Sequence, residues 1–362
     1  MPKRPIGPED AAILYGRNQS EGIDPKDIET ATKLAGFHAR PDFLVRRANQ
    51  IAISAFAEDL GELGITPTQM SSLIVITESP GVDQITLGRR IGVDRTTISM
   101  VVNALEQHGF VRREQSARDA RRNEINATRA GNACTVLARE LARENSRKLL
   151  VGFSDEAVGR FIAFLRRLID NVPNSAPEWV RPDGTTSFGT ESDFQAEFPE
   201  HVAMYNAFGF LLRRSHQTLE STFIESCKPL KLTPHRYSVL KITEQCQSVE
   251  QITLSRWLGL DGSTTATVVT DLADRGWITR KPHLVDKRRR ILKLAPEGRA
   301  ILKAAKPMVQ RASQNALKVL GADTDEFLSL IQRFIVSNEG RSRVPILPAV
   351  TAQIMCRLSA AA

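Results

Sequence analysis

One long segment occurs twice in this chain of 362 residues, and the repeat limits the possible folds more than any other feature. The copies are offset by 167 positions, so Ile65 corresponds to Leu232 (232 − 65 = 167). Between Ile65 and Gly131, 22 of 67 ungapped pairs are identical, where average composition would give about four. Only two copies at so long a period indicate duplicated domains, not a solenoid.

The repeat and the composition between its copies predict five parts. The linker is recognised by the prolines and glycines that gather between positions 173 and 189, since such residues interrupt regular structure. The expected parts are an N-terminal extension (1–40), a first domain (41–170), a linker (171–199), a second domain (200–337) and a C-terminal tail (338–362).

The charge balance favours a polyanionic partner. The chain has 49 basic and 41 acidic residues, a net charge of +8 and an isoelectric point near 9.5, which suits nucleic acid. Its four cysteines lack C-x-x-C spacing, and its six histidines do not cluster with acids or cysteines. We therefore expect no metal, cofactor or disulfide framework.

Other classes of protein are disfavoured by missing motifs. The sequence has no glycine-rich phosphate loop and no nucleophile elbow, so we do not expect an enzyme. No apolar segment of the kind that a signal peptide needs follows the basic Met1–Arg4. No apolar stretch approaches the roughly 18 residues of a membrane-spanning helix. We expect a cytoplasmic protein that does not contact membranes.

Start and stop signals predict the same series of helices in each copy. Thr66 and Thr233 each precede a proline, the arrangement of a helix cap followed by the first helical residue. In each copy a further helix is expected to begin after a glycine turn, at Asp94 in the first copy and at Asp261 in the second. An arginine-rich β-hairpin is expected to follow it. The other expected helices cover about 41–63, 67–79, 85–91, 129–150 and 155–169, with counterparts at about 200–228, 234–246, 252–258, 296–320 and 324–336.

This order of elements is typical of a winged helix-turn-helix, so we expect a mainly α fold with small β-wings. The second helix of such a pair can enter the major groove, with apolar residues inward and short polar or cationic residues outward. Arginines at the wing tips suit phosphates or a minor groove. The residues expected to contact DNA are Arg95, Thr96, Thr97, Ser99, Asn103, Arg118, Arg121 and Arg122 in the first copy, and Ser263, Thr264, Thr267, Thr270, Lys287, Arg288, Arg289 and Arg290 in the second.

These motifs resemble the MarR family of bacterial transcription regulators. The resemblance rests on the Thr-Pro helix starts and the Gly-x-Asp turns at Gly92 and Gly259. It also rests on the wing pattern D-x-R, followed by five residues and then L-T, that begins at Asp119 and Asp286. It implies a sequence-specific regulator of double-stranded DNA, a repressor that leaves a palindromic operator when a small ligand binds. Because family members usually act as homodimers, it also implies that one chain forms an intramolecular pseudo-dimer, with further self-association left open.

The two copies depart from the family pattern in different ways. Gly262 stands where the first copy has Arg95, a position at which the family usually has a cation. The second copy lacks the threonine of the wing pattern, and the first has Ala127 in place of its leucine. We therefore expect the two halves to read their half-sites unequally.

A pattern in the first helix of each copy suggests an effector. The run F-L-x-R-R-x-[NH]-Q, from Phe43 to Gln50 and from Phe210 to Gln217, is similar to a family branch that senses aromatic carboxylates or their CoA thioesters. A guanidinium can hold a carboxylate bidentately while apolar neighbours hold the ring. The candidate ligand-binding residues are Arg46, Asn49, Arg213 and His216, with the alternative that the arginines pair with acids between helices.

Two other functions stay open at this stage. A tandem winged-helix replication initiator would also bind DNA as one chain, but it would recognise repeated iterons instead of half-sites about one helical turn apart. A protein-interaction module that does not bind DNA would show no dependence of binding on salt.

Overall fold

A computed structural model describes residues 25–115, 123–170, 207–283, 287, 289–352 and 354. The chain divides into two compact units. Unit 1 combines Met1–Ile51 with Leu219–Ala362, and unit 2 is Ala52–Thr218. The helices α4 (Pro41–Leu60) and α12 (Phe208–Ser226) each contribute residues to both units, so the units do not follow the two halves of the repeat.

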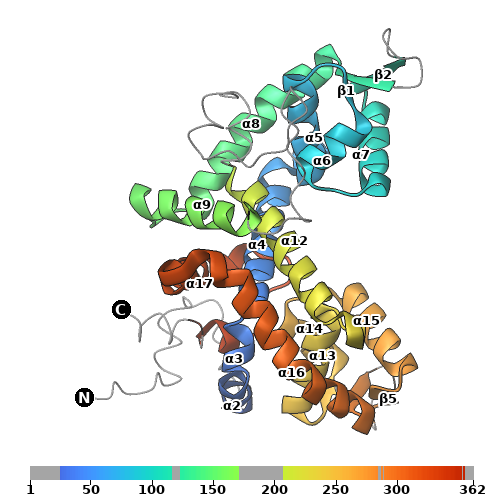
Figure 1. Cartoon of the computed structure of the whole chain (residues 1–362), viewed down its shortest axis with the longest axis vertical. Coiled ribbons are helices and arrows are strands. Elements are labelled where there is room, and N and C mark those ends of the chain that lie inside the picture. Colours follow the sequence, from blue (N-terminus) through green and yellow to red (C-terminus); the bar gives the residue numbers. More distant parts are fainter. Residues whose placement is uncertain are drawn as a thin grey trace. The chain divides into compact units, whose positions relative to one another are not determined.

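Unit 2 contains the first winged helix (Figure 1). Its three strands form an antiparallel sheet in the order β1-β3-β2, in which Val111 pairs with Ala127. Helices α6 and α7 pack on each other and on α5. The elements are η1 (Gly61–Leu63), α5 (Pro67–Glu78), β1 (Val82–Asp83), α6 (Gln84–Ile91), α7 (Arg95–Gln107), β2 (Val111–Gln115), β3 (Asn123–Ala127), α8 (Arg129–Leu149) and α9 (Asp155–Asp170).

Unit 1 contains the second winged helix and the ends of the chain. Its sheet has the equivalent order β4-β6-β5, in which Ile278 pairs with Leu294. The elements are α2 (Pro25–Lys33), α3 (Ala35–His38), η2 (Lys228–Leu230), α13 (Pro234–Cys246), β4 (Val249–Glu250), α14 (Gln251–Leu258), α15 (Gly262–Asp274), β5 (Ile278–Pro282), β6 (Arg290–Leu294), α16 (Pro296–Leu317), η3 (Lys318–Asp323), α17 (Thr324–Asn338) and η4 (Glu339–Arg341).

Helices α5 and α13 begin where the threonine–proline pairs predict. The hydroxyl of Thr66 accepts a bond from the amide of Gln69, and the Gln69 side chain accepts one from the amide of Thr66. This reciprocal capping box satisfies two amides that the helix itself leaves free. Thr233 accepts from the amide of Arg236 at 3.3 Å, so the second copy keeps the cap in a simpler form.

The repeat builds the same core twice. In each winged helix the apolar side chains of the helices meet those of the middle strand of the sheet, and removing this area from water is the main stabilising contribution. Matched positions that are at most 1 % exposed in both copies include Leu73 and Leu240, Leu87 and Leu254, Val102 and Val269, Leu105 and Leu272, and Ile125 and Leu292.

The winged helix-turn-helix fold and its two hairpins are confirmed. The third strands, β1 and β4, are not predicted from the sequence, because two residues are too few to show a strand pattern. The linker and the expected start of the helix at about 200 lie outside the described residues. Among the described helices, none has an apolar stretch long enough to cross a membrane.

Candidate nucleic-acid interface

Helix α7 is the helix of the first copy that is expected to enter the major groove, and we call it and its counterpart α15 the reading helices. It begins after a glycine turn that fixes its direction. Gly92 adopts a left-handed backbone (φ 69°), which favours glycine. Asp94 then caps α7 by accepting bonds from the amides of Thr96 and Thr97, both at 2.9 Å. The hydroxyl of Thr97 also donates to Asp94 at 2.6 Å, and this bond is the main reason that the pKa of Asp94 is lowered.

The two faces of α7 divide as a groove-reading helix requires. Ile98, Val101, Val102 and Leu105 are buried. Arg95, Thr96 and Asn103 are exposed, whereas Thr97 and Ser99 are half-buried. The side chains nearest the amino terminus of the helix are therefore available to a ligand, while the apolar face holds the helix on its unit.

Asn103 also belongs to a network that joins α7 to the wing. Arg113 on β2 donates to Asn103 Oδ1 at 2.7 Å and to Glu106 Oε2 at 2.6 Å. The amide of Arg113 donates to Glu106 at 3.3 Å. Arg113 thus fixes the wing strand to the reading helix, a role that was not predicted from the sequence.

Helix α15, the expected DNA-reading helix of the second copy, begins in the same way but bonds one more hydroxyl to its cap. Asp261 accepts from the amide of Thr264 at 2.8 Å and from the hydroxyls of Thr264 and Ser263 at 2.7 and 2.9 Å. The Thr264 hydroxyl contributes most to lowering the pKa of Asp261, which falls to about 2. Thr267 donates to the carbonyl of Ser263 at 3.0 Å. The exposed first residue, Gly262, offers no side chain.

Farther along α15, an acidic residue collects two arginines. Asp271 accepts from Arg236 Nε at 2.7 Å and from Arg275 Nε at 3.0 Å. The neighbouring Thr270 is exposed. The residue of α7 that matches Asp271 is Ala104, so the two helices differ in charge in the middle as well as at the start.

In the described part of the second wing, some basic residues are exposed and one is held in an ion pair. Lys287 is exposed, and Arg290 begins strand β6. Arg289 donates to Glu250 on β4 through Nε at 2.7 Å and also through Nη2. Glu250 makes no side-chain cap on α14, whereas its counterpart Asp83 caps α6. The predicted residues Arg118, Arg121, Arg122 and Arg288 lie outside the described residues.

The arginines predicted to bind an effector contact the helix-turn-helix in both units. In unit 1, Arg46 Nη2 donates to the carbonyl of Leu258 at 2.7 Å. In unit 2, Arg213 Nη2 donates to the carbonyl of Ile91 at 2.9 Å. Leu258 and Ile91 end the helices that precede the glycine turns. Both arginines therefore bond the last carbonyl before the turn that leads to a reading helix.

The second arginine of each Arg-Arg pair also lies at the glycine turn. Arg214 Nη1 donates to the carbonyl of Gly92 at 3.2 Å and to Gln217 at 2.7 Å. Arg47 lies against Gly259, where an added Cβ would be 2.6 Å from its Nη1. Arg47 is also paired with Glu339 and donates to the carbonyl of Val344 at 2.9 Å.

Arg46 is buried among apolar side chains, and it and Asn49 each have a polar atom without a hydrogen-bond partner among the described residues. It is 6 % exposed, its guanidinium lies 5.2 Å from the ring centre of Phe43, and burial is the main cause that lowers its pKa to about 10. Arg46 Nη1 and Asn49 Oδ1 are buried and have no hydrogen-bond partner in the described part of the chain. In unit 2, Arg213 and His216 are half-buried.

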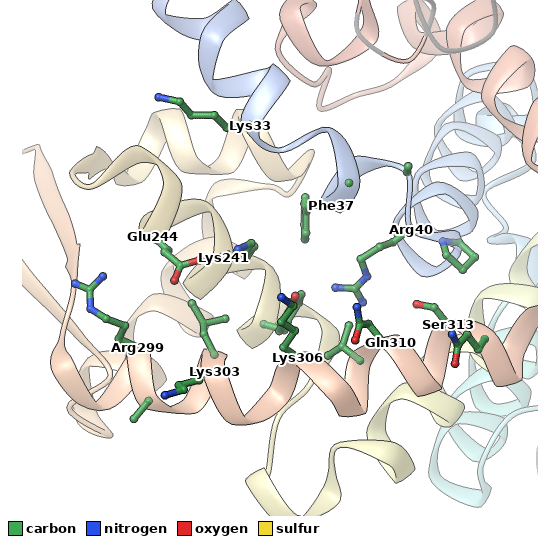
Figure 2. Close-up of a pocket in the computed structure, with 18 of the residues that line it drawn as sticks. Lys33, Phe37, Arg40, Lys241, Glu244, Arg299, Lys303, Lys306, Gln310 and Ser313 are labelled. Carbon is green, nitrogen blue, oxygen red and sulfur yellow. Dashed lines mark hydrogen bonds and ion pairs between the residues drawn. The ribbon is translucent and has the colours of Figure 1, made fainter. Parts of the chain in front are cut away.

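Unit 1 also has a groove between α3, α13 and α16, with a volume of about 1110 Å³ (Figure 2). Its walls combine aromatic side chains, such as Phe37 and Tyr237, with several lysines and arginines. None of the four residues predicted to bind an effector lines it. Within the described ranges, no group of three or more His, Cys, Asp or Glu residues is arranged to hold a metal ion.

The thiols of the described residues are not activated. Burial raises the pKa of Cys134 and of Cys227, and it raises that of Cys246 to about 11. A thiolate is the reactive form, so these three cysteines are poorly suited to sensing oxidants.

Comparison with known proteins places these features in a family. The MarR family model matches residues 65–122 and 232–289, one match in each winged helix. A relative from Thauera aromatica, whose name describes a transcriptional regulatory protein for the hcr operon, is 31% identical over 134 residues, covering 37% of this chain and 77% of the relative. The regulator YybA of Bacillus subtilis is 29% identical over 111 residues, covering 31% of this chain and 74% of its own.

Solved structures include similar chains. A probable transcriptional regulator from Pseudomonas aeruginosa is 31% identical, with a TM-score of 0.34. The similarity covers 35% of this chain and 96% of that one.

Proposed function

Because this chain belongs to the MarR family of DNA-binding transcriptional regulators, we propose that it is a repressor which reads a pseudo-palindromic operator with both of its winged helices. Each half of the repeat, 41–170 and 200–337, supplies one reading helix. A single chain then takes the place of a homodimer, as an intramolecular pseudo-dimer.

The observation that carries this proposal is the exposure of the first turn of both reading helices. Arg95 and Thr96 are exposed on α7, and Ser263 is exposed on α15. In both helices an apolar face is buried behind the exposed turn. This division is what insertion of a helix into the major groove needs.

We assign the predicted residues to three roles. Side chains on the outer faces of α7 and α15 contact base edges, and the basic residues of the wings contact phosphates or a minor groove. Arg46 and Arg213, with Asn49 and His216, bind an aromatic carboxylate or its thioester.

Two features support the effector role of Arg46. Its free Nη1 is a donor for a carboxylate, and the free Oδ1 of Asn49, one helical turn away, is an acceptor for a ligand hydroxyl. Its other terminal nitrogen bonds the carbonyl of Leu258, next to the turn before α15. A carboxylate that draws the guanidinium away would release this carbonyl and loosen the orientation of α15.

The DNA-binding proposal is tested by selecting bound fragments from the source genome and footprinting the full chain on them. We expect two protected half-sites about one helical turn apart. Repeated iterons would favour a replication initiator, and binding that does not change with salt concentration would favour a protein-interaction module.

The effector proposal is tested separately by calorimetry with a panel of aromatic acids, before and after Arg46→Ala and Arg213→Ala. Heat that is lost with the arginine supports the assignment. An absence of heat from every acid in the panel would count against it.

A further inference from the structure

The outer face of α7 carries a large apolar side chain to which the proposed function gives no role. Met100 is 61 % exposed, although its neighbours Val101 and Val102 are buried in the core of unit 2. Single exposed apolar residues are common on protein surfaces, so exposure alone assigns nothing to Met100. The side chains that surround it on the helix are more informative.

Met100 lies between two polar residues that are expected to contact DNA. Thr96 precedes it by four positions and Asn103 follows it by three, so the three side chains share one face of the helix. Thr96 and Asn103 are both exposed. In the proposed complex this face enters the major groove, and Met100 therefore lies on the surface that meets base edges.

The wing determines which atoms Asn103 presents to DNA. Arg113 Nη2 donates to Asn103 Oδ1 at 2.7 Å. A guanidinium has donors only, so the oxygen of the Asn103 amide must face Arg113 and the nitrogen must face away. Glu106 holds the same guanidinium by accepting from Nη1 at 2.6 Å. Asn103 is thus left with its N–H donors for a ligand, since no described residue accepts from them.

These two side chains together match the major-groove edge of thymine. That edge presents an acceptor, O4, and the C5 methyl group. Cytosine has a donor in place of O4, and guanine has no methyl group. The usual pairing of asparagine with adenine needs the amide oxygen as well as the nitrogen, and in Asn103 the oxygen is bonded to Arg113. A donor from Asn103 and an apolar contact from Met100 therefore favour thymine over the other bases.

The second copy lacks this combination. At the positions offset by 167 residues, Thr267 stands for Met100, Thr270 for Asn103 and Ala273 for Glu106. The arginine is kept, as Arg280, without the carboxylate and the amide that hold Arg113. Selection of thymine by these two side chains is thus a property of the first copy.

We propose that Met100 and Asn103 recognise a thymine in the half-site read by α7, through its C5 methyl group and its O4. Arg113 is a positioning residue, which keeps the amide of Asn103 turned so that it donates. This inference rests on the proposed function, and it names the base that the middle of α7 selects.

The methyl contact is tested with operators in which single thymines are replaced by deoxyuridine, which lacks only that methyl group. At one thymine of one half-site, the replacement should weaken binding of the full chain about fourfold, the usual effect of returning one methyl group to water. Met100→Ala should bind the two operators equally, whereas Thr267→Ala, the matched variant of α15, should keep the difference. No sensitive thymine, or an unchanged difference in Met100→Ala, would overturn the contact.

The role of Asn103 is tested at the same position by a change of specificity. Asn103→Asp keeps the shape of the side chain and its bond to Arg113, but it presents acceptors only, which suit the N4 donor of cytosine. The ratio of affinities for thymine and cytosine operators should fall about tenfold or more. Using this ratio cancels the uniform loss that a negative charge near phosphates causes. A ratio equal to that of the unchanged chain would overturn the assignment of Asn103.

The positioning role of Arg113 has its own readout. Arg113→Ala frees the amide of Asn103 to turn its oxygen toward a base, so discrimination between thymine and adenine at this position should decrease. A loss of affinity that is the same for all four bases would show that Arg113 supports only the structure of the wing.

Binding of the natural operator separates this inference from the proposed function. If the operator is bound but neither deoxyuridine nor Asn103→Asp changes the preference as expected, only the thymine assignment fails. If the full chain retains no DNA fragment at all, the proposed function fails and the thymine assignment fails with it.

Discussion

The two reading helices share a backbone plan but differ in the side chains at their first turn. Both follow a left-handed glycine and begin at an aspartate cap. On α7 the first residue is the exposed Arg95, whereas on α15 it is Gly262. Thr97 and Thr264 both donate their hydroxyls to the cap, and on α15 the hydroxyl of Ser263 does so as well. A duplicated fold therefore keeps its core and its caps while the exposed positions diverge, which is where recognition of different DNA bases would be altered.

The supports behind the two helices differ as well. The turn before α7 is bonded by Arg213 and Arg214. The turn before α15 is bonded by Arg46, and Arg47 beside it is fully buried and paired with Glu339 after α17. Glu339 Oε1 in turn accepts from the amide of Ile346 at 2.9 Å. The second turn is therefore joined to the C-terminal segment through an ion pair.

The largest expected effect tests the ion pair behind the turn before α15, against the simpler bond of Arg46 at the same turn. Arg47→Ala should lower the free energy of unfolding by about 3–5 kcal/mol, because it leaves the buried carboxylate of Glu339 without its partner. Arg46→Ala removes a single hydrogen bond, to the carbonyl of Leu258, and should cost about 1–2 kcal/mol. Urea titration of both variants measures the two losses, and equal losses would contradict the comparison.

The loss caused by Arg47→Ala should also depend on pH. Burial raises the pKa of Glu339 above its ordinary 4.5, and Arg47 opposes that rise. A carboxyl group whose folded pKa is raised stabilises the fold below its ordinary pKa, and this stability is lost as the pH rises through the raised value. The deficit of Arg47→Ala should thus shrink on acidification toward pH 4.5, and Glu339→Gln in the same chain should abolish that pH dependence.

The next largest effect concerns the asymmetry of DNA reading. Arg95→Ala should weaken binding at one half-site by about 1–3 kcal/mol, the range for losing a direct base contact. Gly262→Arg is the converse variant, and Gly262 is exposed, with no atom within 4 Å of an added Cβ. Footprinting should show protection lost on one side in the first variant and strengthened on the other side in the second. Equal loss on both sides after Arg95→Ala would contradict unequal readout.

A smaller effect is expected at the cap of α15. Asp261→Ala should cost about 1 kcal/mol, the usual contribution of a helix cap, and Asp261→Asn, which keeps an accepting oxygen, should cost less. The pKa of Asp261 is lowered to about 2 from 3.8, so its contribution is present above pH 3.8 and is lost as the pH falls toward 2. Thermal unfolding between pH 2 and pH 6 measures this, and a loss in Asp261→Ala that grows on acidification would be inconsistent with it.

The smallest effect separates the two wing cations of the second copy. Lys287→Ala should reduce the log–log slope of DNA affinity against salt by about one phosphate contact. Arg289 is held by Glu250, so Arg289→Ala should change the slope less than Lys287→Ala does. The reverse order would show that the pair with Glu250 opens when DNA binds.

The sequence predicts much of this fold because its signals are local. Thr66 and Thr233 begin helices, glycines form the turns, and the repeat shows which positions are buried together. The third strands of the sheets escape prediction, because each is two residues long and depends on pairing with a distant strand, as in Val82 with Ile125.

The candidate site was predicted only in part, for a similar reason. The exposed positions of the reading helices follow from helical periodicity, as at Arg95 and Ser263. The bonds of Arg46 to Leu258 and of Arg213 to Ile91 join residues 212 and 122 positions apart, and backbone carbonyls leave no trace in a sequence pattern. Arg113 is hidden as well, because its partners lie on a different element.

The central claim is that one chain uses both winged helices on one operator. It is tested most directly by footprinting a selected genomic fragment with the full chain while the number of chains per fragment is measured in solution. The account predicts two protected half-sites about one helical turn apart with a single chain bound. Protection of one half-site alone, or two chains needed for the same two half-sites, would contradict it.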